Sequence, residues 1–139
     1  MTEPWVVFTL NDQRYCTDAA QIKEVITYRP ANPVPGAPVG VEGIITVRSD
    51  KITLFSGARL VAKLDSAPKE DGHIILIESD DGLFGLTIDG VEGIIELNPD
   101  HIDPSSVTDD NAVLGTIPLN GQLLTAVSLV TFCENAIAE

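Results

Sequence analysis

The sequence lacks a long hydrophobic run and has only two cysteines in 139 residues. A transmembrane helix needs about 20 consecutive apolar residues, and the opening stretch MTEPWVVFTLND shows no basic segment, apolar stretch and cleavage site of a secretory signal. We therefore expect a cytoplasmic protein that is neither exported nor inserted into a membrane. Cys16 and Cys133 lie far apart and outside any CxxC pattern, which predicts two buried free thiols.

Basic residues are scarce. The chain has 8 lysines and arginines against 21 aspartates and glutamates, for a net charge of −13. Such a charge repels the phosphates of nucleic acids and of anionic lipid headgroups. We therefore expect no nucleic-acid partner, and a partner recognised through charge should be basic. The alternative is that the acidity only keeps the protein soluble.

The residue patterns of catalysis, metal binding and cofactor binding are also missing. Neither His73 nor His101 has a second metal ligand three or four residues further along. The motifs GxSxG, GxGxxG and GxxxxGK[ST] do not occur. We expect no enzyme, metal or cofactor. A small hydrolase that uses His73 or His101 with a nearby serine is the alternative from another functional class.

Short apolar runs recur between Gly, Pro, Asn and Asp residues, as in WVVFTL, KITLF, HIILI and QLLTAV. This pattern predicts many short strands in an all-β fold. Asn11-Asp12 and Asn120-Gly121 mark two tight turns, and the second suits a type I′ hairpin. Since 44% of the residues are hydrophobic, we expect residues 1–139 to form a single compact domain.

The chain also repeats itself. An offset of 69 residues aligns Asn11-Asp12 with Asp80-Asp81, and an offset of 72 aligns 41–45 with 113–117. Although chance matching of apolar strands is the alternative, the order of turns and glycines favours two β-units, roughly 5–65 and 73–135. Each unit should end in a helix capped by a serine, Ser56 or Ser128. The second helix has an apolar stripe of Leu129, Phe132, Cys133, Ala136 and Ile137.

One passage is more specific than these patterns. Residues 34–38, VPGAP, followed by 40–48, GVEGIITVR, resemble the loop and hairpin that are diagnostic of the CheW family of chemotaxis coupling proteins. The segments 22–26, IKEVI, and 84–92, FGLTIDGVE, resemble further strands of that family. The resemblance covers about residues 5–133. It implies two small five-stranded SH3-like β-barrels side by side, with short helices including one at the C-terminus.

The resemblance also implies a function. CheW proteins are non-enzymatic adaptors that couple chemoreceptors, the methyl-accepting chemotaxis proteins, to the histidine kinase CheA. By resemblance, the groove between the barrels would take the cytoplasmic tip of a receptor, and the barrel ends would pack against the regulatory domain of CheA. The protein would then be recruited to the membrane through receptor arrays.

The receptor-facing surface is expected to hold Arg48, oriented by a bidentate pair with Glu24 on a neighbouring strand. The kinase-binding residues are not assigned. The complete set of receptor-facing residues implied by the resemblance is Ile22, Glu24, Ile44, Val47, Arg48, Ile88 and Val91.

Four positions depart from the family pattern. Thr46 stands where Asn is common, and Ser49 stands where the family has Gly, at a site that often needs positive φ. We expect the hairpin tip to shift toward Ser49-Asp50. Ser56 and Ser128 replace Asp, which exchanges one good N-cap for another. The departures at Thr46 and Ser49 motivate an alternative, a CheW-like binding module that binds receptors or other polar array components without coupling a kinase.

Overall fold

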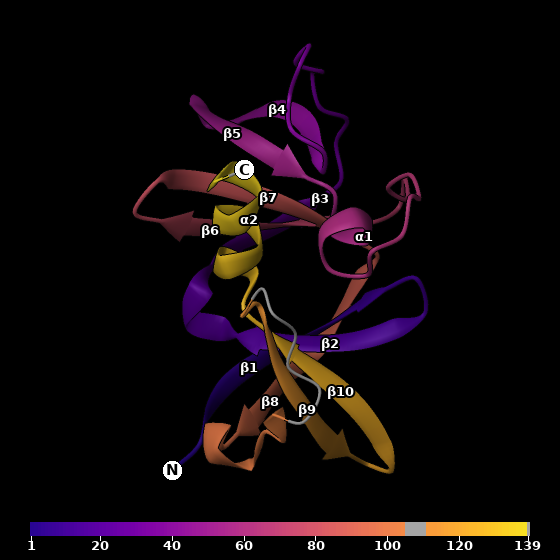
Figure 1. Cartoon of the computed structure of the whole chain (residues 1–139), viewed down its shortest axis with the longest axis vertical. Coiled ribbons are helices and arrows are strands. Elements are labelled where there is room, and N and C mark those ends of the chain that lie inside the picture. The colour runs from indigo at the N-terminus through magenta and orange to yellow at the C-terminus, as the bar shows by residue number, and fades with distance from the viewer. Residues whose placement is uncertain (105–110, 139) are drawn as a thin grey trace.

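The computed structural model describes residues 1–104 and 111–138. Within these residues the chain forms ten strands and two α-helices, with two five-stranded sheets as the main structure (Figure 1). The all-β prediction is confirmed. The strands are β1 (Glu3–Leu10), β2 (Gln13–Asp18), β3 (Ile22–Thr27), β4 (Val41–Val47), β5 (Asp50–Phe55), β6 (His73–Ser79), β7 (Gly82–Ile88), β8 (Gly90–Leu97), β9 (Val113–Leu119) and β10 (Gln122–Val127).

The sheets do not follow the two halves of the sequence. The first sheet has the strand order β8-β1-β2-β10-β9, and the second has the order β3-β6-β7-β5-β4. The first sheet combines the hairpin β1–β2 of the N-terminal half with β8, β9 and β10 of the C-terminal half. The second combines the hairpin β6–β7 of the C-terminal half with β3, β4 and β5 of the N-terminal half. This arrangement corrects the prediction that residues 5–65 and residues 73–135 form separate units, because each sheet contains strands of both. The chain passes from the first sheet to the second at the 3-10 turn η1 (Ala19–Gln21), which the Asp18 carboxylate caps, and β3 then pairs with β6.

The internal repeat is nevertheless visible in atomic detail. A side chain on Gly43 would put its Cβ 2.2 Å from the carbonyl oxygen of Asn32, and one on Gly115 would put its Cβ 2.1 Å from that of Asp103. Both glycines have positive φ, 145° and 142°, and both adjoin an isolated backbone bridge, Asn32 to Ile44 and Asp103 to Thr116. The offset of 72 residues therefore relates equivalent positions in the fold.

The hairpin turns are also repeated. Arg48 and Ser49 have φ values of 47° and 75°, and Asn120 and Gly121 have values of 50° and 79°. Two successive positive φ values are typical of type I′ turns, so the turn predicted at Asn120-Gly121 is confirmed. The predicted shift of the other tip toward Ser49-Asp50 is wrong, since Asp50 already lies in β5. Ser49 instead adopts the left-handed conformation, so the two central residues of the turn are Arg48 and Ser49.

Both serine-capped helices are present. Helix α1 (Gly57–Leu60) begins at Ser56, whose Oγ accepts a hydrogen bond from the Arg59 N–H. It ends after one turn, and Lys63, with φ of 59°, turns the chain away from the helix axis. Helix α2 (Leu129–Ala138) begins after Ser128, which accepts from the Thr131 N–H.

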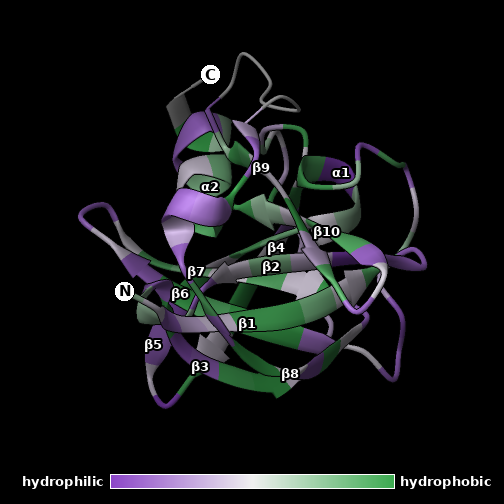
Figure 2. Ribbon diagram, turned by 90° about the horizontal axis from the view of Figure 1, so that it is seen from below, coloured by the Kyte–Doolittle hydropathy of each residue, from purple (hydrophilic) through white to green (hydrophobic). Residues whose placement is uncertain are grey.

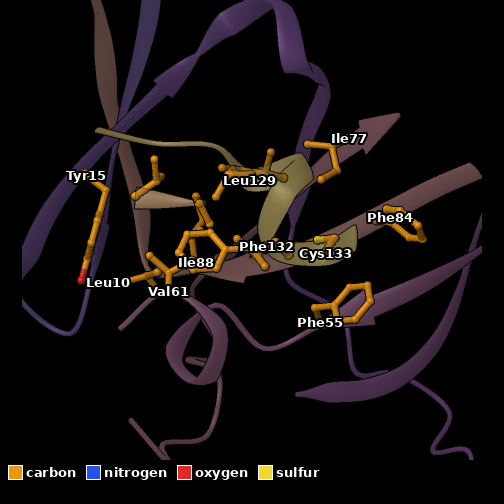
Figure 3. Close-up of a cluster of buried hydrophobic side chains, with 14 of the residues drawn as sticks. Leu10, Tyr15, Phe55, Val61, Ile77, Phe84, Ile88, Leu129, Phe132 and Cys133 are labelled. Atoms are coloured by element: carbon orange, nitrogen blue, oxygen red, sulfur yellow. The ribbon is translucent and has the colours of Figure 1, made fainter. Parts of the chain in front are cut away.

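The main core lies where the two sheets and α2 meet. Figure 3 shows Phe132 and Cys133 of α2 directed toward the same cluster as Phe55 and Ile88. In Figure 2 hydrophobic residues follow the strands, while the turns are mostly hydrophilic. The predicted stripe of α2 is buried except for Ile137, which is 43% exposed. Cys16 and Cys133 are buried free thiols, as predicted.

Candidate functional site

An arginine and a glutamate meet on the surface at the tip of the β4–β5 hairpin. Arg48 Nη1 donates to Glu24 Oε2 at 3.1 Å, and Nη2 donates to Oε1. The predicted bidentate pair is therefore present. The side chain of Arg48 is 65% exposed and that of Glu24 is 33% exposed, so one face of the guanidinium–carboxylate pair remains open to a partner.

The pair also sets the charge of both groups. The hydrogen bond from Arg48 lowers the pKa of Glu24 below its usual value, and the attraction of the guanidinium acts in the same direction. Glu24 in turn raises the pKa of Arg48. Both side chains are ionised at neutral pH in any case, and the pair favours the charged form of each, so the bidentate fork is present at neutral pH.

The prediction that Glu24 lies on a neighbouring strand needs refinement. Strands β3 and β4 are the two opposite edges of the second sheet, so they are not hydrogen-bonded neighbours. Contacts from β3 and the segment after it close the gap between these edges. Asn32 and Ile44 exchange two backbone hydrogen bonds of 2.9 Å, and Arg29 Nη1 donates to the Thr46 carbonyl oxygen at 3.0 Å. We call this line of contacts the seam: Asn32–Ile44, Arg29–Thr46 and Glu24–Arg48.

Two of the predicted receptor-facing residues belong to the core instead. Val47 is 5% exposed and Ile88 is 2% exposed, and each packs in a buried apolar cluster. A side chain without accessible surface cannot contact a partner, so both are removed from the proposed surface. Val47 faces inward because it alternates with Thr46 on β4, as the pleat of a strand requires.

The other three predicted residues are accessible but do not all lie together. Ile22 is half-buried on β3 and packs against the main core. Ile44, also half-buried, lines a hollow of about 420 Å³ together with Val34 and Phe55. Val91 is 40% exposed but lies on β8, an edge strand of the first sheet. The structure therefore brings Glu24 and Arg48 into direct contact and leaves the other three at separate positions.

Sequence reasoning missed Arg29 and the hollow beside Ile44. The hollow is lined by apolar residues of the loop between β3 and β4 and by Ile137 of α2. Its loop side coincides with the VPGAP segment, and nothing in that sequence pattern indicates a hollow. Arg29 belongs to no motif, and nothing in the sequence pairs it with a backbone carbonyl.

The chain is similar in sequence to proteins of a known family. Its sequence matches the family described as CheW-like domain over residues 4–134. The chain belongs to the CheW-like domain family. Similar proteins include the chemotaxis protein CheW of Rhizobium meliloti (strain 1021), 23% identical over 128 residues that span 89% of this chain and 83% of the relative. The chemotaxis protein CheW of Thermotoga maritima is 24% identical over 119 residues, 84% of this chain and 78% of the relative.

A solved CheW structure is also similar. The crystal structure of the scaffolding protein TtCheW from Thermoanaerobacter tengcongensis matches with a TM-score of 0.81 and 26% sequence identity, covering 93% of this chain and 86% of that protein. The resemblance inferred from the VPGAP and GVEGIITVR segments is thus confirmed, and this CheW-like chain shares the fold of a scaffolding protein.

The two histidines of this CheW-like domain differ in their exposure to water. His73 Nδ1 is buried and has no hydrogen-bond partner within the described residues, whereas His101 is exposed in the turn after β8. Across residues 1–104 and 111–138 no group of three or more His, Cys, Asp or Glu side chains could hold a metal ion. The same part of the chain contains no helix long and apolar enough to cross a membrane.

Proposed function

We propose that this chain is a non-enzymatic adaptor that couples chemoreceptors to the histidine kinase CheA. Its family and its named relatives place it among chemotaxis coupling and scaffolding proteins. The observation that carries the proposal is the bidentate Arg48–Glu24 pair, which stands exposed at a hairpin tip.

The pair is better suited to recognition than to folding. An exposed ion pair contributes little to stability, because water screens the charges and two long side chains must be ordered. A guanidinium held by a carboxylate is already ordered before a partner arrives, which lowers the entropic cost of binding. The open face of Arg48 can then donate to a carboxylate or carbonyl oxygen on the receptor tip. Ile44 and Ile22 supply partly exposed apolar surface on the same sheet.

The proposed partners are the cytoplasmic tip of a chemoreceptor and the regulatory domain of CheA. In this proposal the chain is cytoplasmic and reaches the membrane through the receptor array. The hydrolase alternative draws no support from the family, whose named members are chemotaxis and scaffolding proteins.

A co-sedimentation experiment tests the adaptor function. Membranes that carry receptors are mixed with the purified chain, with CheA, or with both, and the pellet is analysed for each protein. We expect the chain to pellet with receptor membranes and to increase the amount of CheA that pellets with them. Membranes without receptors are the control.

The same experiment separates the two CheW-like functions. A chain that pellets with receptors but leaves CheA in the supernatant is a binding module without kinase coupling, the alternative that Ser49 and Thr46 motivate. A chain that stays in the supernatant with every membrane contradicts both.

A further inference from the structure

The seam contains a second arginine whose position suggests a role in recognition. Arg29 follows β3 by two residues, and its Nη1 donates to the carbonyl oxygen of Thr46 at 3.0 Å. Thr46 precedes Arg48 by two residues on the β4–β5 hairpin. We propose that Arg29 is a positioning residue, which fixes the edge of β4 so that Arg48 meets Glu24 in the receptor-facing geometry. The binding readout of this proposal rests on the function proposed above.

The geometry of β4 explains why its edge needs such a contact. Ile44 exchanges both backbone hydrogen bonds with Asn32, so its polar groups point away from β5. Because these directions alternate along a strand in an antiparallel pair, Thr46 also points its backbone groups away from β5. Arg29 reaches the Thr46 carbonyl from the β3 side of the gap. The hairpin is thus tied to the opposite edge at every second residue: 44, 46 and 48.

The repeat within the chain serves as an internal control. In the first sheet Thr116 and Asp103 exchange backbone hydrogen bonds of 2.8 and 2.9 Å, which reproduces the bridge between Ile44 and Asn32. The next two contacts are not reproduced. Pro118 stands at the position of Thr46, and Asn120 and Gly93 stand at the positions of Arg48 and Glu24.

The residue that matches Arg29 also differs. Asp100 precedes Asp103 by three residues, just as Arg29 precedes Asn32. A carboxylate side chain has no N–H to donate to a carbonyl oxygen. The first sheet nevertheless brings its β9 edge to the segment after β8 through the backbone bridge. A barrel of this type therefore closes without the two arginine contacts, so closure alone does not require them in the second sheet.

Recognition by a bidentate pair requires this kind of support. A binding constellation has to be held within about 0.5 Å of its productive geometry by contacts beyond its own members. Both side chains of the Arg48–Glu24 pair are accessible to water, so the pair cannot hold two sheet edges by itself. Arg29 contacts β4 at Thr46, two residues before Arg48 and close to the turn, so it limits the movement of the tip directly.

The test compares Arg29→Ala and Arg29→Lys with the control Arg59→Ala. Arg59 is another partly exposed arginine in an ion pair, with Asp65 on the connector after α1, so its removal changes the net charge equally without touching the seam. We expect Arg29→Ala to weaken binding to receptor membranes about fivefold, the usual effect of losing one such hydrogen bond. Lysine should restore part of the loss, and the control should bind as the parent does.

A double variant distinguishes positioning from direct contact. If Arg29 acts through Arg48, Arg29→Ala combined with Arg48→Ala should bind no more weakly than Arg48→Ala alone. Losses that multiply would overturn the proposal, because Arg29 would then contact the receptor itself. Unchanged binding by Arg29→Ala would also overturn it.

A second measurement does not depend on the receptor. The Nε–H signal of Arg48 in the NMR spectrum reports how firmly its guanidinium is held. We expect this signal to be sharp in the parent and in Arg59→Ala, and broadened in Arg29→Ala. An unchanged signal overturns the positioning role even if the parent fails to bind receptors, a result that would contradict only the proposed function.

Discussion

At the residue scale, the Arg48–Glu24 pair carries the functional assignment. Arg48→Glu places two carboxylates side by side and removes the donor fork, so receptor binding should fall at least tenfold, as for a central interface residue. Arg48→Lys should recover only part of the binding, because lysine keeps the charge and loses the planar fork. The melting temperature should remain nearly unchanged in both variants, since the side chain is 65% exposed.

Equilibrium binding to receptor membranes and thermal unfolding, measured on the same preparations, check this prediction. Arg59→Glu is the matched control, because it reverses the charge of another ion-paired arginine away from the hairpin. Parent-like binding by Arg48→Glu contradicts the assignment. A large drop in melting temperature contradicts it as well, since the loss of binding would then reflect unfolding.

Residue by residue, the sequence predicts the Arg48–Glu24 pair but not the burial of all the apolar residues assigned to the same surface. Arg48 and Glu24 could be paired in advance because both lie in segments that resemble the family. Val47 and Ile88 were assigned to the surface by resemblance, although the alternation of Gly43, Ile45 and Val47 on one face of β4 points inward. Arg29 could not be found, because its partner is a backbone carbonyl that only the tertiary structure brings within reach.

At the scale of elements, the hairpins at Arg48-Ser49 and Asn120-Gly121 offer a matched pair of tests. Ser49 has φ of 75° and Gly121 has φ of 79°. A residue with a side chain is strained by about 1 kcal/mol in this conformation. Ser49→Gly should therefore raise the melting temperature by about 4 °C. Gly121→Ser should lower it by a similar amount, although no atom lies within 4 Å of the added Cβ.

Thermal unfolding of the two variants gives the result. If Ser49→Gly has no effect, the turn relieves its strain in another way, and the equivalence of the two hairpins does not extend to their energetics. Receptor binding by Ser49→Gly also shows whether this departure from the family affects recognition.

The two cysteines give a test of how firmly the elements pack. Cys16 lies on β2 and Cys133 on α2, and burial raises the pKa of each thiol to about 12. Because the thiolate is the reactive form, neither residue should react with a thiol reagent in the native protein at neutral pH. Both should react in denaturant. Rapid labelling of one cysteine in the native state would show that its element detaches from the core.

Strands and turns could be predicted from the sequence because their signals are local. Apolar runs bounded by Gly, Asn and Asp predicted the strands, and Asn120-Gly121 predicted its turn type. The length of α1 could not be predicted, because its end depends on Lys63 adopting a left-handed conformation. The exposure of Ile137 was missed because it depends on how α2 lies against the sheets.

At the scale of the whole molecule, the exchange of strands between the two halves could not be predicted. The halves have similar apolar patterns, so β3 and β8 could each pair with either first hairpin, β1–β2 or β6–β7. The choice depends on the short turn at Ala19–Gln21 and on the single residue between β7 and β8, Asp89, neither of which has a strong sequence signal. Period-two alternation fixes which face of a strand is buried but not which strand it pairs with.

The charge of the whole molecule predicts how binding responds to salt. With a net charge of −13, attraction to a basic partner surface should weaken as ionic strength rises and the screening length falls below the physiological value of about 8 Å. Titration of receptor binding and of CheA binding with salt measures this. Binding that does not change with salt would show that an apolar interface, such as the hollow beside Ile44, dominates instead.

The coupling of receptor to kinase is the central claim, and the autophosphorylation rate of CheA measures it most directly. Receptor membranes and CheA are assayed alone, with the parent chain, with Arg48→Glu and with Arg59→Glu. The parent and Arg59→Glu should change the rate in a way that depends on receptor ligand, and Arg48→Glu should not. If the parent pellets with receptor membranes and CheA yet leaves the rate and its ligand dependence unchanged, the chain does not couple the two and the account is wrong.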